Sequence, residues 1–464
     1  MSLHTVRRGF DIRVAGAPAA DGRADELRVP SRVALLGADY PGMRPTMRVR
    51  EGDSVSRGDV LFEDKKTPGV RFTAPLAGRV AAVHRGERRA FRSLVIEVNP
   101  DERAGGGGSA GHAPSGWSGR HPDALTDETV RELLLESGEW TAIRTRPFGR
   151  VANPETRPRA VFLTATDSAP LAPDPVAAVA GRDTDLEWGA AAAAKLTDGP
   201  VFVCSRAGRR LPVPEGDRVR HEAFTGPHPA GTAGLHIHRL APVRRGHEAW
   251  HLDAQDLASI GKLFRTGSGD ALRVVSLGGP PLRRPALLRA PIGASLDDFA
   301  APDLEVGAGP AERRVISGSL LSGRTASGEV TGYLGRYHRQ VTVLEEDRRR
   351  RFLGWLAPGA AAVSVSRAYL SSVLPSRARG LTTGTNGSRR AIVPIGTYDK
   401  VMAFDIPAAM LCRALLMEDI ERAEELGVLE LIEEDVGLLT FACPAKNDYA
   451  PALRRVLDTL EKEG

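Results

Sequence analysis

Histidine is concentrated in one short stretch of this chain. Six of the eleven histidines lie between residues 221 and 251. We expect His236 and His238 to share one face of a strand, where they could bind a metal ion together. Zinc sites use three or four ligands, however, and no HExxH motif or cysteine pair accompanies these histidines. We therefore expect a polar loop that contacts a ligand or a partner, shaped by the turn at residues 226–231, and no metal site.

A second stretch, residues 320–340, combines glycine-rich turns with side chains that can donate hydrogen bonds. It contains Arg324, Tyr337 and one histidine. Such side chains suit the wall of a groove for a ligand or a partner. The same pattern is also typical of ordinary hairpins, and the sequence favours that interpretation.

The cysteines are few, far apart and odd in number, which indicates a reducing compartment and no disulfide scaffold. They are Cys204, Cys412 and Cys443. Counting back from Cys443-Pro444, a C-x2-C-x2-C-x3-C-P run would place further thiolates at positions that are Glu433, Val436 and Leu439 here. One thiolate cannot hold a four-iron cluster. We therefore expect Cys443 to be a buried cysteine before a proline turn that binds no cluster.

Motifs for nucleotide binding and covalent catalysis are missing from the sequence. It has no GxGxxG after a strand, no GxxxxGK[ST] loop and no GxSxG elbow. The Gly-Ser-Gly run at residues 267–269 precedes its strand, which is the wrong order for a loop that cradles phosphate. The formal net charge is only +5, and opposite charges are interspersed, so nucleic acid is not an expected partner. The sequence leaves one alternative open, a basic face that binds anionic lipid or an acidic partner. Salt-dependent membrane attachment would reveal such a face.

Neither a membrane span nor a secretion signal is expected. The longest apolar candidate, at residues 188–194, is short and mostly alanine, whereas a spanning helix needs about 18 to 20 apolar residues. The N-terminus has charges but no apolar core before a small-residue cleavage site. The cytoplasm is therefore the expected compartment.

Short strands broken by turns fill the first hundred residues. In residues 49–83, Gly-Asp pairs separate alternating strands, and a hairpin tip lies near residues 65–69. This pattern resembles the flattened β-barrel of biotinyl and lipoyl carrier domains, in which a lysine at the tip carries the cofactor. Lys65 or Lys66 would have that role here. The tip contains an inserted Pro68-Gly69 and lacks the Met-Lys-Met of biotin carriers, so we expect neither lysine to be modified.

With 464 residues, the chain is long enough for about three domains of about 150 residues. The predicted divisions are residues 1–99 (carrier-like β domain), 100–125 (flexible Gly-rich linker), 126–265 (Rossmann-like α/β domain), 266–345 (small mixed domain) and 346–464 (mixed, then helical). Within the α/β domain we expect a first helix over residues 126–137, strands at 160–165 and 200–204, and an Ala-rich helix near 188–196 between them. A further strand is expected at residues 273–277.

The C-terminal region predicts packing helices. Asp405 is expected to cap a helix with Pro407 in its first turn and Met410 turned inward. A second helix is expected over residues 418–426, and the last one from about Pro451.

Long segments in one order resemble the A subunits of the sodium-translocating NADH:quinone reductases. They are residues 33–75, 143–151, 224–238, 251–264, 281–296, 317–326, 333–341, 386–402 and 443–457. The resemblance covers nearly the whole chain and implies an α/β multidomain fold. It adds an SLBB-like β-grasp assignment for residues 266–345 and a cluster-less, ferredoxin-like remnant in the helical tail.

The resemblance also implies a function. It places the chain as a peripheral subunit on the cytoplasmic face of the bacterial inner membrane, in a complex that oxidises NADH, reduces ubiquinone to ubiquinol and exports Na+. The partners would be the five other subunits, B to F, chiefly the membrane-embedded B subunit. This chain would bind no redox cofactor of its own, because FAD, FMN, riboflavin and an iron-sulfur centre would belong to the other subunits.

Within that complex we expect this chain to contact quinone or its partner, and we expect no catalytic or metal-binding residue in it. The candidate contact residues are His228, His236, His238, Arg324 and Tyr337. Ubiquinone needs an apolar slot and a few donors for its carbonyl oxygens, which these side chains can supply.

Two other classes of protein are alternative interpretations of the sequence. A carrier-domain protein would show a mass increment on Lys65 or Lys66. A stand-alone soluble flavin oxidoreductase would be yellow when purified alone. The altered hairpin and the missing flavin motif disfavour both.

Overall fold

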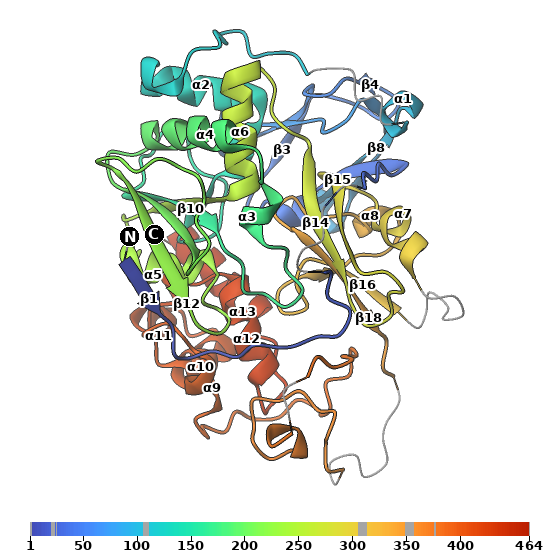
Figure 1. Cartoon of the computed structure of the whole chain (residues 1–464), viewed down its shortest axis with the longest axis vertical. Coiled ribbons are helices and arrows are strands. Elements are labelled where there is room, and N and C mark those ends of the chain that lie inside the picture. Colours follow the sequence, from blue (N-terminus) through green and yellow to red (C-terminus); the bar gives the residue numbers. More distant parts are fainter. Residues whose placement is uncertain are drawn as a thin grey trace.

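The structure is a computed structural model. It describes residues 2–19, 24, 26–104, 111–304, 313–348, 357–374 and 377–463. Within these residues the strands form four sheets, and most of the C-terminal region is helical (Figure 1). The predicted α/β multidomain fold class is confirmed. No helix in these ranges is both long enough and apolar enough to cross a membrane.

The carrier-like part is a sandwich of two small antiparallel sheets. One sheet has the order β2 (Arg32–Leu36), β8 (Phe91–Val98), β7 (Gly78–Arg85) and β4 (Ser54–Val55), and the other β3 (Pro45–Met47), β5 (Val60–Asp64) and β6 (Arg71–Thr73). Their apolar faces meet in a buried core that includes Phe62, Phe72 and Ile96. Lys65 and Lys66 are exposed at the start of the turn between β5 and β6.

A six-stranded sheet forms the α/β part. Its order is β1 (Ser2–Thr5), β12 (Val219–Thr225), β11 (Val201–Arg206), β10 (Ala160–Ala165), β13 (Ala249–Asp253) and β9 (Arg144–Arg146). The neighbours from β1 to β13 pair in parallel, and β9 is antiparallel. The strands expected at 160–165 and 200–204 are thus present, because short apolar runs are typical of buried parallel strands. The first strand of the chain joins this sheet by pairing with β12.

Helices cover both faces of this sheet. Alternate side chains of β10 face opposite ways: Val161 and Leu163 share a core with α4 (Asp183–Lys195) and α6 (Ala254–Thr266), and Phe162 shares one with α5 (Ala233–Leu240). The Ala-rich helix α4 lies very close to α6. A Cβ atom added at Gly261 would lie 1.7 Å from the Asp185 carbonyl oxygen, so only glycine permits this approach. The expected first helix is α2 (Asp127–Ser137), and the Thr126 side chain caps it.

The third part is a mixed five-stranded sheet. Its order is β15 (Ala286–Pro291), β14 (Leu272–Gly278), β18 (Gln340–Glu345), β16 (Arg313–Ser317) and β17 (Arg324–Thr325). The helix α7 (Leu296–Ala300) contributes Leu296 and Phe299 to its core. The strand expected at 273–277 is β14.

The C-terminal helices are α9 (Thr397–Val401), α10 (Ala408–Met417), α11 (Ile420–Glu425), α12 (Glu433–Ala442) and α13 (Ala450–Glu463). The last two expected helices are present, but two details of α10 were wrong. Its N-cap is Pro407 without a side-chain cap, so Asp405 does not cap it. Met410 is 57% exposed, because Leu411 and Leu415 form the buried face instead.

The segment expected as a linker is packed in part. Residues 100–103 form the short helix α1 (Pro100–Arg103), and the Trp117 Nε1 donates a 2.8 Å hydrogen bond to the Phe264 carbonyl oxygen at the end of α6. The glycine run at residues 105–108 lies outside the described residues.

Replacing this tryptophan should release the segment that follows it. In Trp117→Ala, the loss of the hydrogen bond and of the indole packing should speed tryptic cleavage after the exposed Arg120 several-fold, as mapped by mass spectrometry of short digests. Cleavage after Arg103 in the same digest is the internal control and should keep its rate. Equal rates after Arg120 in both proteins would show that Trp117 does not anchor the segment.

Candidate functional site

The five candidate contact residues fall into two groups. His228, His236 and His238 lie where the α/β sheet meets the C-terminal helices. Arg324 and Tyr337 lie where the carrier-like part, the α/β part and the third part meet. The two groups come from different junctions of the fold.

The expected strand around His236 and His238 is wrong, because both residues lie in helix α5. On a helix, residues two positions apart point in different directions, so these rings do not form a metal-binding pair. The sequence Leu-His-Ile-His alternates as a strand does, but its backbone is helical, and the consecutive residues 233–237 are all buried. Within the described residues, no three His, Cys, Asp or Glu side chains are grouped so as to hold a metal ion.

Two of these histidines are buried and neutral. The His228 Nδ1 lies 3.0 Å from the Ser168 hydroxyl, and the His236 Nε2 donates a 3.0 Å hydrogen bond to the Ala230 carbonyl oxygen. Burial lowers the pKa of each ring to about 4, because a charged imidazole would lose its water. Both rings therefore fix the shape of the 226–231 turn from inside.

His238 joins two domains. Its Nε2 accepts a 3.0 Å hydrogen bond from the Asp405 backbone N–H, so the proton is on Nδ1, which donates to the Glu430 carboxylate at 2.7 Å. The ring thus holds α5 of the α/β part against two loops of the helical part. Nearby, Arg146 of β9 forms a fully buried ion pair with Asp435 of α12.

Arg324 and Tyr337 connect three parts of the chain. The Arg324 guanidinium forms an ion pair with Asp39 of the carrier-like part. The Tyr337 hydroxyl donates a 2.8 Å hydrogen bond to the Thr141 carbonyl oxygen of the α/β part. The guanidinium of Arg144 lies 4.4 Å from the centre of the Tyr337 ring, in a cation–π contact.

Sequence reasoning missed the strongest charge cluster, which lies beside Tyr337. Three arginine side chains donate to the buried Asp256 carboxylate: Arg273 at 2.6 Å, Arg339 at 2.7 Å and Arg336 at 2.9 Å. Burial by itself would raise the pKa of Asp256, but the three guanidinium groups outweigh it and hold that pKa well below its ordinary value. The partners lie up to 83 positions away in the sequence, so no local motif could indicate them.

A cavity of about 280 Å³ lies at this three-part junction. Its wall includes apolar side chains, such as Tyr40, Phe72 and Ile292, and charged ones, such as Arg336 and Glu139. One Glu139 carboxylate oxygen accepts a 2.8 Å hydrogen bond from Ser259, while the other is buried without a partner among the described residues. Burial raises the pKa of Glu139. Tyr40 and Thr141, which line the cavity, both contact Tyr337.

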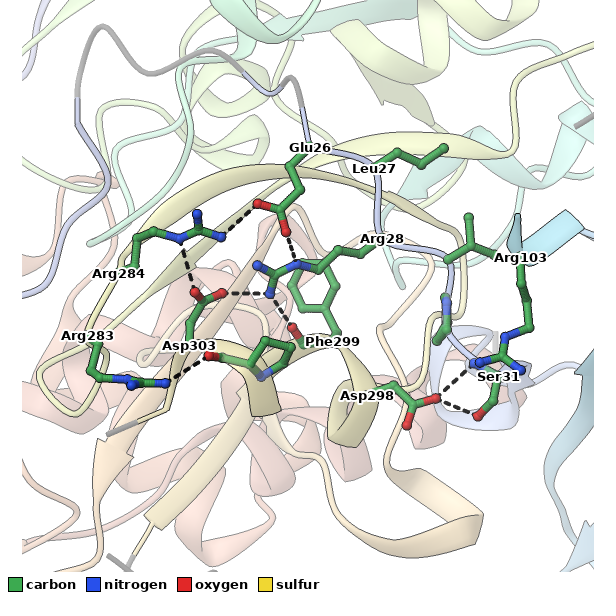
Figure 2. Close-up of a pocket in the computed structure, with 13 residues that line it drawn as sticks. Glu26, Leu27, Arg28, Ser31, Arg103, Arg283, Arg284, Asp298, Phe299 and Asp303 are labelled. Atoms are coloured by element: carbon green, nitrogen blue, oxygen red, sulfur yellow. Dashed lines mark hydrogen bonds and ion pairs between the residues drawn. The ribbon is translucent and has the colours of Figure 1, made fainter. Parts of the chain in front are cut away.

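A larger pocket, of about 950 Å³, lies between residues 26–31 and the third part of the fold, away from the candidate residues (Figure 2). Its carboxylates already have partners: Arg28 pairs with Asp303 at 2.6 Å, and Arg284 pairs with Glu26 at 2.7 Å. Ser31 donates to the Asp298 carboxylate. We place the candidate site at the junction cavity, because the carboxylates of the larger pocket are already paired.

The residues around Cys443 do not fit an iron-sulfur cluster. The cysteine is buried, as expected, and its sulfur lies 3.1 Å from the Tyr398 hydroxyl and 3.2 Å from that of Tyr449. Glu433 pairs with Arg454 at 2.6 Å. Val436 and Leu439 are buried in the apolar core. The positions that a cluster would need for thiolates therefore have structural contacts of their own.

Three family models match the chain. Their descriptions are "NqrA N-terminal barrel-sandwich hybrid domain" (residues 4–99), "NqrA second alpha/beta domain" (125–269) and "NQRA C-terminal domain" (274–328). A curated relative from Serratia proteamaculans, named as the A subunit of a Na(+)-translocating NADH-quinone reductase, is 46% identical over 459 residues and 99% of each chain. The chain belongs to this NqrA family.

Other curated members of the NqrA family are similar to this chain over the same length. Relatives of the same name from Hahella chejuensis and Yersinia pestis are 45% and 44% identical, again over 99% of each chain. Among solved structures, an NAD+-reducing NiFe-hydrogenase matches 48% of this chain and 48% of its own at 15% identity and a TM-score of 0.35, which is too weak to carry an argument.

Removing the central carboxylate of this NqrA-family chain should destabilise it strongly. Asp256→Asn leaves three buried guanidinium groups around a neutral amide, which should cost about 3–5 kcal/mol in the free energy of unfolding by urea. The control Asp198→Asn breaks an exposed pair with Arg157 and should cost about 0–1 kcal/mol.

The cost should also depend on pH. The lowered pKa means that Asp256 stabilises the wild type above the ordinary aspartate pKa of about 4 and loses that contribution as the pH falls further. The difference between wild type and Asp256→Asn should therefore shrink below about pH 4. A variant as stable as Asp198→Asn at neutral pH would contradict the central role of this carboxylate.

Proposed function

We propose that this chain acts as the A subunit of a membrane complex that oxidises NADH, reduces ubiquinone to ubiquinol and exports Na+. Membership of the NqrA family over 99% of the chain carries this proposal. In it, the chain is peripheral on the cytoplasmic face of the inner membrane and docks chiefly on the membrane-embedded B subunit. The flavins, the iron-sulfur centre and the NADH site are on the other subunits, B to F.

We propose further that the chain contributes to quinone access at the junction cavity. The cavity combines apolar walls with charged groups, and its 280 Å³ is at the small end for ligand pockets, which enclose about 300–1,000 Å³. That size suits a ring and not a long isoprenoid tail. Neither His228 nor His236 lines this cavity, whereas its wall residues Tyr40 and Thr141 contact Tyr337, so the Arg324 and Tyr337 junction is the better candidate of the two groups.

Arg57 is the side chain we assign to a quinone carbonyl oxygen. It lines the junction cavity, and its Nε is buried without a partner in the described part of the chain. Its Nη2 pairs with Glu102 at 2.9 Å, which fixes the guanidinium at the cavity wall. A quinone oxygen accepts hydrogen bonds only, so a free N–H is the complementary group.

Purification from native cells tests the place of the chain in a complex. A tagged chain extracted in mild detergent should elute in fixed ratio with integral membrane subunits and a flavoprotein, and the preparation should reduce ubiquinone with NADH. Recovery of the chain alone, under conditions that keep other respiratory complexes intact, would contradict the proposal.

A substitution at the cavity tests quinone access in that preparation. Arg57→Gln removes the free donor and should raise the KM for a short-chain ubiquinone about tenfold or more, the worth of one hydrogen bond to a charged group. NADH oxidation with an artificial acceptor should be unchanged. The control Glu102→Gln alters the partner of the same arginine but keeps its Nε, so the KM should stay within about twofold. Equal KM changes in both variants would contradict the assignment.

A further inference from the structure

Exposed apolar side chains are concentrated near one end of the molecule. Of ten large apolar side chains that are exposed in the described residues, eight lie between residues 370 and 417. Five of these belong to one stretch without α-helix or named strand, and they are Leu370, Val373, Leu374, Val393 and Ile395. Val373 is 77% exposed and Ile395 is 61% exposed. We call the described residues of 357–396 the end surface, because their loops form the lower end of the long axis in Figure 1.

The end surface has an unusual charge. Residues 357–396 contain five arginines and no aspartate or glutamate, although the whole chain has 58 acidic residues. Their charge of +5 equals the formal net charge of the whole chain, so all other residues together sum to zero. The mild overall charge therefore conceals a strongly basic surface at one place.

No acidic side chain in the described part of the chain pairs with these arginines. Ion pairs are common elsewhere, for example between Arg455 and Glu418 at 2.6 Å. Arg389 and Arg390 are both exposed. Arg390 also lies near a third cation, Lys446, whose pKa is lowered by burial first and by the charge of Arg390 in addition. Cations held side by side without an anion are repelled from one another and favour an anionic ligand.

The end surface is nevertheless fixed to the domain. Its inward side packs four apolar side chains, Val363, Val365, Leu381 and Ile392, against the core of the C-terminal helices. Backbone hydrogen bonds join Arg379 to residues 13 and 15, and Arg390 to Ala445. Apolar side chains therefore divide into an anchored inner set and an exposed outer set. The Arg379 guanidinium donates to the Ala362 and Ser371 carbonyl oxygens, so the outer apolar set and the other four arginines are left for a partner.

We propose that the end surface docks on an anionic lipid membrane. Phosphate headgroups complement its four exposed arginines, Arg367, Arg377, Arg389 and Arg390. The interfacial layer below the headgroups accepts Val373, Ile395 and their exposed neighbours. The described residues of the end surface offer no α-helix or regular strand to a shape-matched protein partner, whereas a fluid surface requires no shape match. The proposal goes beyond the assembly of the complex and does not depend on quinone binding.

Vesicle flotation with the purified full chain tests this proposal. The chain should float with vesicles of phosphatidylcholine and phosphatidylglycerol and not with phosphatidylcholine alone. Binding should fall steeply between about 50 and about 500 mM NaCl, because salt screens the attraction. Free inorganic phosphate at constant ionic strength should not displace the chain, since it lacks the apolar layer.

Two double variants separate the charged and the apolar contributions. Arg389→Gln with Arg390→Gln should weaken partitioning about 30-fold, at about 1 kcal/mol for each arginine. Val373→Ser with Ile395→Ser should weaken it about fivefold or more through lost apolar burial. The matched controls are Arg88→Gln with Arg89→Gln, an exposed arginine pair of the carrier-like part, and Leu3→Ser, a 62% exposed leucine of β1; both should bind as the wild type does.

Three results would overturn the proposal. The first is no flotation with the anionic vesicles at low salt. The second is equal weakening by the control pair and the end-surface pair. The third is loss of association with the other subunits in Arg389→Gln with Arg390→Gln while vesicle binding persists, which would make the end surface a protein interface. Failure of the Arg57 experiment would leave vesicle binding untouched, so the two proposals fail separately.

Discussion

One buried carboxylate fixes the relative positions of three parts of this protein. Asp256 of helix α6 accepts hydrogen bonds from Arg273 of β14 and from Arg336 and Arg339 in the loop before β18. Burying four charges costs free energy, and only their close mutual contacts offset it. The same loop donates its Arg336 backbone N–H to Asp39 at 2.9 Å, which ties in the carrier-like part. The junction cavity depends on this arrangement, since Arg336 forms part of its wall.

A second buried pair holds the C-terminal helices against the α/β sheet. Arg146 and Asp435 are both fully buried, and His238 bridges the same two parts nearby. These contacts give His238 a structural role at a domain junction. Because both junctions are internal, the membrane contact that we propose is assigned to an outer surface, the end surface.

How much the sequence predicts depends on whether a feature is local. The strand β10 and the last helix α13 were predicted correctly, because a short apolar run and an apolar stripe each indicate one structure. The stretch around His236 was predicted as a strand and is a helix, because alternation over a few residues fits both. Met410 was expected inside, but the neighbouring leucines cover the core and leave it exposed.

The candidate site likewise combines features that are local in the sequence with features that are not. By itself, the sequence determined the family, local elements such as β10 and α13, the burial of Cys443 and the loss of a cluster's thiolates, because each depends on residue types at short spacing. Only the tertiary structure decided that Tyr337, Arg57 and Asp256 meet around one junction. It also decided that five arginines lie at one end without an acidic partner among the described residues. Charge pairing is set by distances in space between residues far apart in the chain, and a sequence does not contain those distances.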